Sequence, residues 1–437
     1  MAHACTPFAA RRNAFARRMG KGVAVLQGAL EIRRNGDVTF DFRQDSDLYY
    51  LTGFEEPDTV AVFAPHHPEH RFILFVRPRD PAKEVWDGRR AGVEGARKRY
   101  GADMAYTIDQ LDEVLPRYLT GNDRLFYTMG RNAPFDERMI ALLNRMRGQV
   151  RAGMAAPSTL EDPAVILAEM RLFKGPEELD HLRKAVALTD EGHRAAMAAT
   201  KPGRFEYQIQ AEMEGVFRAG GSPRVGYGSI VGSGENATIL HYRENSRRMR
   251  DGDLLLIDAG TEFGYYTADI TRTFPVNGRF TDAQREVYEI VLEAQKEGIK
   301  RVRPGATFQA AHDAAVEVLT EVCRKLGLLK GRTAALIKSE AYKRFYMHRT
   351  GHWLGMDVHD AGRYKDGKAW RKLAPGMVLT VEPGLYIAPD LKSAPARYRG
   401  IGIRIEDDIL VTKRGNENLS GAIPREADEV EAAVGRG

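Results

Sequence analysis

The sequence predicts an α/β (α+β) fold arranged as two domains. Its 437 residues exceed the roughly 150 that a single compact core usually encloses. Short apolar runs alternate with amphipathic stretches along the chain, and a small, polar, proline-containing stretch at 153–163 interrupts them. We therefore expect residues 1–172 to form one domain and residues 173–437 to form the other.

Three short apolar runs predict the strands of the first domain. Residues 22–28, 58–65 and 71–78 are bounded by glycine or proline, which is typical of buried strands in α/β proteins. A helix is expected at 136–148, where apolar residues recur at helical spacing before Gly148. No catalytic motif accompanies these elements, so we expect the chemistry to lie in the second domain.

The second domain is expected to combine long helices with three strand-bearing segments. Pro176 and the acidic residues that follow it favour a helix start, which predicts a long helix at 176–200. Further helices are predicted at 281–302 and 307–327, and strands within 253–276, 376–387 and 400–412. Another helix is predicted at 164–175, across the boundary between the two domains.

Composition and charge exclude several classes of protein. The net charge of +5 is small for this length, and basic residues are interspersed with acidic ones, which argues against a nucleic-acid-binding surface. Cys5 and Cys323 lie far apart, so no disulfide framework is expected. The N-terminal stretch has no signal-peptide core, and no run approaches the ~18 apolar residues that cross a bilayer. We expect a cytoplasmic protein without nucleic-acid or membrane partners.

Two acidic residues stand out on apolar strands. Asp258 follows "LLLI" and Asp269 precedes "ITRTF". If Phe263 and Gly264 form a two-residue hairpin connection, Asp258 faces Asp269 across the ladder, with Cβ atoms ~5 Å apart. Carboxylates this close repel unless one is protonated or a cation lies between them, and a divalent metal is the simplest solution.

Glu382 and Glu406 repeat this pattern in later strands. Each is an acid on an otherwise apolar strand, and Arg404 lies two residues before Glu406 on the same face. A single acid on a strand often only faces solvent. Four of them around a histidine-rich segment favour a metal site.

That segment, "HRTGHWLGMDVHD" at 348–360, contains His348, His352 and His359. The spacing of the first two suits a helical zinc pair, but the helical metalloprotease motif requires glutamate where Arg349 stands. Two glycines also disfavour a helix, so a loop followed by a strand is expected. Taken alone, each histidine is more often structural than catalytic.

Charge indicates how many ions such a site would hold. Four carboxylates and one neutral imidazole carry four negative charges, which two divalent ions cancel. An oxygen-rich shell without thiolates suits Mn²⁺, Co²⁺ or Fe²⁺ better than structural zinc, although affinity alone does not exclude Zn²⁺. Two ions ~3.5–4 Å apart can share a bridging hydroxide.

The order of these motifs resembles one family. "IDAG", "DITRTF", "HRTGHWLGMDVHD", "TVEPGLY" and "GIGIRIEDD" together resemble the metal-dependent aminopeptidases of the pita-bread fold, most closely the aminopeptidase P (Xaa-Pro aminopeptidase) family. "DFRQDSDLYYLTGFEEPD" is similar to the creatinase-like N-terminal domain of that family. The resemblance implies a creatinase-like α/β domain at 1–172, for substrate restriction and oligomerisation, and a pita-bread catalytic domain at 173–437.

The resemblance also implies a role for each residue that matches a family motif. The matching metal ligands are Asp258, Asp269, His352, Glu382 and Glu406, of which Asp269 and Glu406 would bridge two ions. The matching substrate-site residues are His241, His348, His359, Tyr386 and, at the cleft of a neighbouring subunit, Trp86. Arg404, Thr271 and Tyr227 match residues that support the ligands.

By the same resemblance, the protein is expected to be an exopeptidase that releases the N-terminal residue from peptides with proline in second place. Because most soluble oligomers are symmetric assemblies of identical chains, a homo-oligomer of two or four chains is also expected. A hydroxide bridging two ions, with Mn²⁺ expected, attacks the scissile carbonyl. His359 stabilises the oxyanion, and Glu382 passes the proton to the leaving proline nitrogen. His241 and His348 shape the site for the proline.

Two alternatives stay open. A prolidase that cuts only Xaa-Pro dipeptides would share these domains and ligands, although Trp353 directly after His352 favours aminopeptidase P. A metal-free binding protein or creatinase-like hydrolase of the same fold usually lacks ligands that are all present here. One departure from the family is Arg349, where a small residue is usual. If that position required a positive φ, arginine would be strained there.

Overall fold

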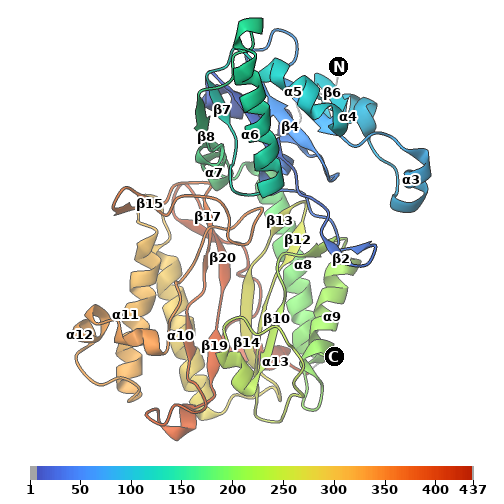
Figure 1. Cartoon of the computed structure of the whole chain (residues 1–437). Coiled ribbons are helices and arrows are strands. Elements are labelled where there is room, and N and C mark those ends of the chain that lie inside the picture. The colour runs from blue at the N-terminus through green and yellow to red at the C-terminus, as the bar shows by residue number, and fades with distance from the viewer. Residues whose placement is uncertain (1–6, 436–437) are drawn as a thin grey trace. The chain divides into compact units, whose positions relative to one another are not determined.

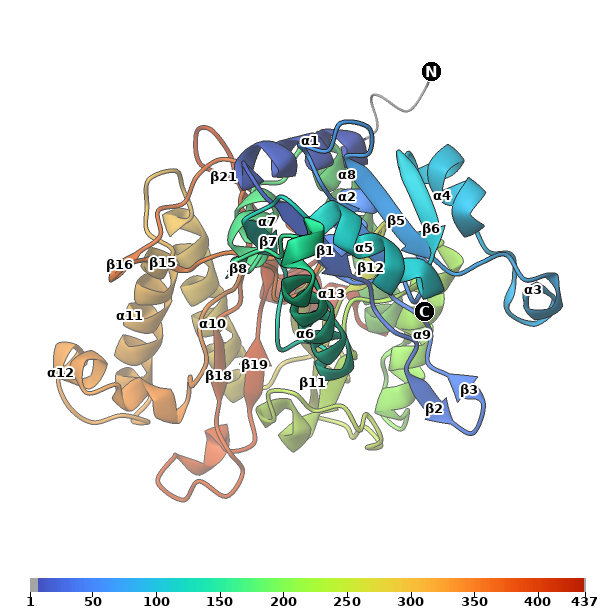
Figure 2. The same ribbon diagram turned by 45° about the horizontal axis from the view of Figure 1, so that its top comes forward.

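The computed structural model describes residues 7–435 and divides into two compact units, Met1–Met170 and Arg171–Gly437 (Figure 1, Figure 2). Helices and strands mix in both units, which confirms the α/β class. Cys5 lies outside the described residues, and Cys323 is a buried free thiol. In the part of the chain described, no helix is both long and apolar enough to cross a membrane.

A six-stranded mixed sheet forms the centre of the first unit. Its strands are β1 (Val23–Gln27), β4 (Val60–Phe63), β5 (Phe72–Val76), β6 (Met104–Thr107), β7 (Arg124–Phe126) and β8 (Thr159–Glu161). Their order is β6-β5-β4-β1-β7-β8, with β1 antiparallel to β4 and parallel to β7. The three strands predicted for this domain are confirmed as β1, β4 and β5.

Six of the described helices lie wholly within this unit, and all except the exposed α3 bury side chains in its core. They are α1 (Pro7–Met19), α2 (Ser46–Thr52), α3 (Pro81–Asp87), α4 (Gly92–Tyr100), α5 (Leu111–Leu119) and α6 (Ala133–Gly148), and a small hairpin joins β2 (Arg33–Asn35) to β3 (Val38–Thr39). Leu115 of α5 and Met139 of α6 share one buried core with Val25 and Ile73 of the sheet. The predicted helix at 136–148 is confirmed as α6, which begins after the capping side chain of Asn132.

The second unit contains several small antiparallel sheets. Their strands are β9 (Arg224–Val225), β10 (Ile230–Ser233), β11 (Leu254–Ala259), β12 (Thr261–Phe263), β13 (Tyr266–Thr267), β14 (Ile270–Pro275), β15 (Lys365–Asp366), β16 (Ala369–Trp370), β17 (Val378–Val381), β18 (Gly384–Tyr386), β19 (Gly402–Arg404), β20 (Asp407–Val411) and β21 (Asn416–Asn418). The sheet orders that matter for the site are β10-β11-β14, β17-β20-β21 and β18-β19.

Two pairs of helices flank these strands, as Figure 1 shows: α8 and α9 on one side, α10 and α11 on the other. The helices of this unit are α8 (Pro176–Ala199), α9 (Glu206–Ala219), α10 (Asp282–Arg301), α11 (Gln309–Lys325), α12 (Thr333–Lys338) and α13 (Ala427–Ala433). Thr281 starts α10 through a capping box with Gln284, as its place before the helix predicts. Apolar side chains of α9, α10 and α11 meet those of β11 in one core, so the helices support the strands from outside.

The helix predicted at 164–175 is shorter than expected. α7 (Ala164–Leu172) ends three residues early. The backbone nitrogen of Lys174 donates instead to the carbonyl of Gly376 at 2.8 Å, and that of Gly175 donates to the side chain of Glu178 at 2.8 Å. The chain therefore leaves the helix to begin α8 at Pro176.

The predicted register of the acidic hairpin is wrong by two residues. Phe263 pairs with Tyr266, so Gly264 and Tyr265 form the turn, both with positive φ. A two-residue hairpin turn favours positive φ at both residues, but a bulky tyrosine rarely adopts it. For this reason the sequence predicts the turn one residue earlier, at Phe263 and Gly264. Asp258 consequently lies opposite Thr271 rather than Asp269.

Two further acidic residues lie where paired strands separate. Glu382 stands between β17 and β18, and Glu406 between β19 and β20. β17 pairs with β20, whereas β18 pairs with β19. At such junctions the side chains are not confined to a continuous sheet face, and both glutamates turn towards the same cavity.

Candidate metal centre

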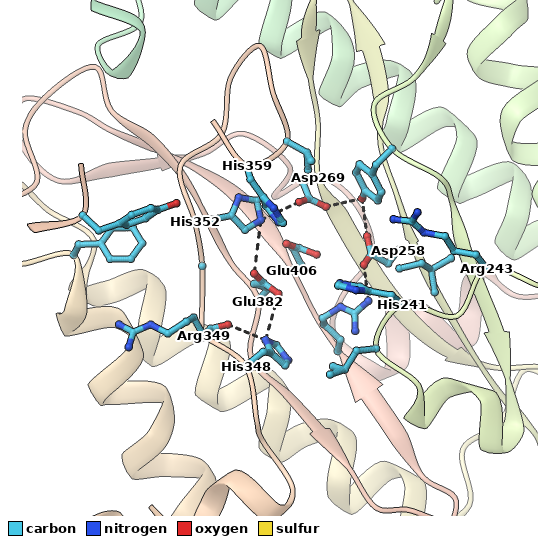
Figure 3. Close-up of a pocket in the computed structure, with 18 of the residues that line it drawn as sticks. His241, Arg243, Asp258, Asp269, His348, Arg349, His352, His359, Glu382 and Glu406 are labelled. Carbon is cyan, nitrogen blue, oxygen red and sulfur yellow. Dashed lines mark hydrogen bonds and ion pairs between the residues drawn. The ribbon is translucent and has the colours of Figure 1, made fainter. Parts of the chain in front are cut away.

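The five residues expected as ligands line one cavity of about 780 Å³ within the second unit (Figure 3). Asp258 comes from the end of β11 and Asp269 from the residue before β14. His352 comes from the loop that precedes β15, and Glu382 and Glu406 come from the strand junctions. Segments more than 100 residues apart in sequence thus contribute to one site.

The closest grouping involves Asp269, His352 and Glu406. One ligand atom from each lies within 4.8 Å of the others, which is compatible with a shared ion. His352 Nε2 is 3.2 Å from Asp269 Oδ2 and 3.7 Å from Glu382 Oε1. Glu382 therefore adjoins this group through the imidazole.

Asp258 is linked to the same group by the hydroxyl of Tyr227. That oxygen lies 2.6 Å from Asp258 Oδ1 and 2.5 Å from Asp269 Oδ1. A phenol has one proton to donate, so it can satisfy only one of two ionised carboxylates at a time. The displaced register has not separated the two aspartates, because diagonal neighbours on a hairpin still share a face.

Two carboxyl groups of this centre, those of Glu382 and Glu406, resist ionisation. Burial raises the pKa of Glu382 to about 8. The charge of Asp269 also raises this pKa, whereas the charge of His352 lowers it. Burial and the charges of Asp269 and Glu382 raise the pKa of Glu406 well above its ordinary value. Oxygen donors that converge in a buried cavity and repel one another fit a divalent cation, which would hold them all ionised.

Arg404 provides the fixed positive charge beside these acids. Its Nη2 donates to Asp258 Oδ2 at 2.5 Å and its Nε to Thr271 Oγ1 at 3.1 Å. Thr271 in turn donates to Glu406 Oε2 at 2.6 Å. A buried arginine thereby orients two carboxylates, one directly and one through a hydroxyl group.

A chain of hydrogen bonds runs from Arg404 to His348. Arg404 Nη1 donates to the hydroxyl of Tyr386 at 2.9 Å, and that hydroxyl lies 2.9 Å from His348 Nε2. His348 Nδ1 lies 2.8 Å from the carbonyl of Arg349, which can only accept. His348 therefore carries its proton on Nδ1 and accepts from Tyr386 at Nε2. Burial lowers the pKa of His348 to about 3, so the ring is neutral.

The remaining predicted substrate residues fall in two places. His359 lines the cavity with its ring 4.3 Å from that of His352, edge to face, and His241 lines the cavity from the segment before β11. Trp86 lies on α3 in the first unit, where it is 86% exposed. Its role at a neighbouring subunit stays a prediction.

Arg349 fits its position without backbone strain. The described non-glycine residues with positive φ are Asp58, Asn245, Tyr265 and Glu340, and Arg349 is not among them. Its side chain lines the cavity and donates to Gln309.

Sequence reasoning missed the residues that hold the histidine loop. Asp360 accepts from Arg171 Nη2 at 2.6 Å and from Lys174 Nζ at 2.9 Å, and all three side chains are buried. The Asp360 backbone nitrogen also donates to the carbonyl of Trp353 at 2.9 Å, which closes the loop that follows His352. The two aspartates of the histidine-rich segment were the available signal, but their partners lie 186 residues or more away.

Comparison with known proteins agrees with this geometry. The model of metallopeptidase family M24 matches residues 180–413, and that of the aminopeptidase P N-terminal domain matches residues 8–127. The chain is 45% identical to the Xaa-Pro aminopeptidase of Escherichia coli K12 over 429 residues, which cover 98% of this chain and 97% of that protein.

Solved structures give the same result. The structure of Pseudomonas aeruginosa aminopeptidase PepP superposes with a TM-score of 0.96 at 47% identity, covering 98% of this chain and 97% of that one. A variant of Escherichia coli aminopeptidase P in complex with substrate matches with a TM-score of 0.94 at 44% identity and the same coverage. The chain therefore belongs to metallopeptidase family M24 and carries the N-terminal domain of aminopeptidase P.

Proposed function

We propose that this chain is a metal-dependent Xaa-Pro aminopeptidase, which releases the N-terminal residue from peptides with proline in second place. The observation that carries the proposal is the convergence of four carboxylates and His352 on one buried cavity in a chain of this family. Relatives that align over nearly the full chain bear this activity in their names.

The residues that would hold two divalent ions are Asp258, Asp269, His352, Glu382 and Glu406, with Asp269 and Glu406 shared between the ions. Four carboxylates and a neutral imidazole balance two such ions in charge, and Mn²⁺ is the metal we propose, with Co²⁺, Fe²⁺ or Zn²⁺ as alternatives. When bound, the ions supply Lewis acidity towards the scissile carbonyl and activate water near neutral pH.

Glu382 is the proposed proton carrier. Proline's amide nitrogen bears no hydrogen, so the leaving nitrogen must gain a proton as the bond breaks. Glu382 lies in the cavity within 3.5 Å of His348 Nδ1 and 3.7 Å of His352 Nε2, where it can take a proton from the attacking water and deliver it to that nitrogen.

The histidines shape the space around the reacting carbonyl. His359 is proposed to donate to the developing oxyanion, and its exposed edge in the cavity suits that task. His348 and His241 are proposed to contact the proline. Arg404 and Tyr386 hold His348 in one orientation and one tautomer through the hydrogen bonds described above.

Some proposals concern the whole assembly. We propose that the first unit restricts the length and shape of substrates, that Trp86 reaches the cleft of a neighbouring subunit, and that the protein is a homo-oligomer of two or four chains. A cytoplasmic location is proposed on the sparse cysteine content.

Hydrolysis of three peptides by the metal-loaded protein tests the function. Ala-Pro-Ala should release alanine, whereas Ala-Ala-Ala should stay intact because a secondary amide lacks the proline geometry. A dipeptide, Ala-Pro, separates the proposed activity from that of a prolidase. Cleavage of the dipeptide alone would favour the prolidase, and failure to cleave any proline peptide would refute both.

A further inference from the structure

Besides Arg404, which pairs with Asp258, three cationic side chains line the same cavity as the four carboxylates: Arg243, Arg349 and Lys365. Within residues 7–435, no carboxylate lies at ion-pair distance from any of them. Figure 3 places Arg349 and Arg243 on opposite sides of the carboxylates. The cavity thus combines an acidic centre with basic walls whose charges no carboxylate of the described chain neutralises.

Two of these cations share one aromatic support. The guanidinium carbon of Arg349 lies 4.7 Å from the centroid of the Trp370 ring, and Lys365 Nζ lies 4.4 Å from the same centroid. Lys365 and Trp370 are direct partners in the β15–β16 hairpin, so the backbone holds them together. Cation–π attraction fixes both charges over the ring.

Contacts with the start of α11 keep this wall in place. The Trp370 ring stacks on Phe308, with centroids 6.4 Å apart, and Arg349 also donates to the side-chain oxygen of Gln309 at the start of α11. One amide oxygen leaves most of the five guanidinium N–H donors available. Two like charges held over one ring repel, and an anion bound beside both would relieve that repulsion.

The polarity of the cavity orients a peptide. When the ions are bound they balance the charge of the ligand carboxylates, whereas no carboxylate of the described chain balances the basic wall, so a carboxylate on a bound peptide is attracted to that wall. We propose that Arg349 and Lys365, supported by Trp370, form a subsite for a substrate carboxylate beyond the proline. The inference rests on the proposed function and extends it to the preferred class of substrate.

That carboxylate has two sources: the C-terminus of a short peptide, or the side chain of aspartate or glutamate after the proline. The contact is remote from the scissile bond and is made equally in the ground state and the transition state. It therefore acts mainly on KM. Because the site is open to water, its effect on kcat/KM should be about fivefold, as for an exposed ion pair.

Matched peptides separate the two sources. Ala-Pro-Ala against its C-terminal amide tests the terminal carboxylate, and the amides of Ala-Pro-Glu and Ala-Pro-Gln test the side chain. The wild type should favour the acidic member of at least one pair by about fivefold in kcat/KM, through a lower KM. The Arg349→Gln/Lys365→Gln double variant should reduce that ratio to near one, and Arg349→Lys should restore part of it.

Arg243→Gln is the matched control, because it removes the same charge from the opposite wall. It should keep most of the wild-type ratio. A wild-type ratio near one for both peptide pairs, or a loss of the ratio in Arg243→Gln as large as that in the double variant, would overturn the subsite while leaving the proposed peptidase activity intact. A metal-loaded protein that cleaves none of the four peptides would overturn the proposed function itself.

Discussion

Lys174 Nζ lies 2.9 Å from Asp360 Oδ2, and both side chains are buried. Arg171 completes the group on the other oxygen of Asp360. Burial alone would raise the pKa of Asp360, but the two cations outweigh it and lower the pKa below its ordinary value. The group ties the loop carrying His352 and His359 to the end of α7 and the segment that leads into α8.

We expect Asp360→Asn to destabilise the second unit by about 3–5 kcal/mol, because it leaves two buried cations uncompensated. Urea unfolding at pH 7 measures this. Asp357→Asn is the control: Asp357 also pairs with Arg171, but its side chain is 41% exposed, so the expected loss is below about 1 kcal/mol. Equal losses in the two variants would contradict the assigned importance of the buried group.

Tyr386→Phe should slow catalysis. The variant removes both the donor to His348 Nε2 and the acceptor for Arg404, so neither side chain keeps its orientation. A loss of roughly 10- to 100-fold in kcat is expected, as for other residues that orient catalytic groups. Tyr342→Phe is the control, since no hydrogen bond of its hydroxyl is seen within residues 7–435. An unchanged kcat in Tyr386→Phe would show that the chain of hydrogen bonds from Arg404 through Tyr386 does not position His348.

The metal-free protein should become less stable as pH rises from 5 to 8. The pKa of Glu382 is about 8 in the folded protein, against about 4.3 for an unfolded glutamate, so the folded state holds the extra proton over this range. Stability then falls by about 1.4 kcal/mol per pH unit for each such carboxyl. Divalent metal should stabilise the protein more at pH 8 than at pH 5.

Thermal melts of chelated and metal-loaded protein across pH 5–8 measure this effect. Glu382→Gln should show a shallower fall with pH and a smaller metal-induced shift. A metal-free protein that grows more stable towards pH 8 would contradict the account of the buried acids.

His193 should make the protein sensitive to acid. Burial, with the nearby Arg272, lowers the pKa of this imidazole to about 3. An unfolded histidine titrates near 6.5, so stability is lost as pH falls below that value, by about 1.4 kcal/mol per pH unit. His193→Leu should flatten the dependence of the free energy of unfolding on pH between pH 4 and 6.5. The difference in this free energy between variant and wild type at pH 8 reports the change in packing alone. An unaltered slope would refute this assignment.

Some features of the site can be predicted from sequence patterns, whereas the strand register cannot. One acid on an apolar strand indicates little, but four of them around a histidine-rich segment form a pattern visible in the sequence, which predicts Asp258, Asp269, Glu382 and Glu406 as ligands. Register was harder: the turn at Gly264 and Tyr265 depends on a positive φ in a bulky residue, which propensity disfavours.

Partners distant in sequence escaped prediction for a different reason. In the sequence Asp360 is one more acid in a loop, and only the fold shows that Lys174, between α7 and α8, lies against it. Tyr227 was expected only through family resemblance, because no local pattern shows that its hydroxyl reaches both Asp258 and Asp269. Such contacts arise from tertiary packing and leave no periodic trace in the chain.

The most direct test is to titrate chelated protein with Mn²⁺ while following release of alanine from Ala-Pro-Ala. The account predicts that chelation abolishes turnover, that two equivalents per chain restore it, and that a variant carrying both Asp269→Asn and Glu406→Gln neither binds the ions tightly nor recovers. Full turnover by protein from which all metal has been removed would contradict it.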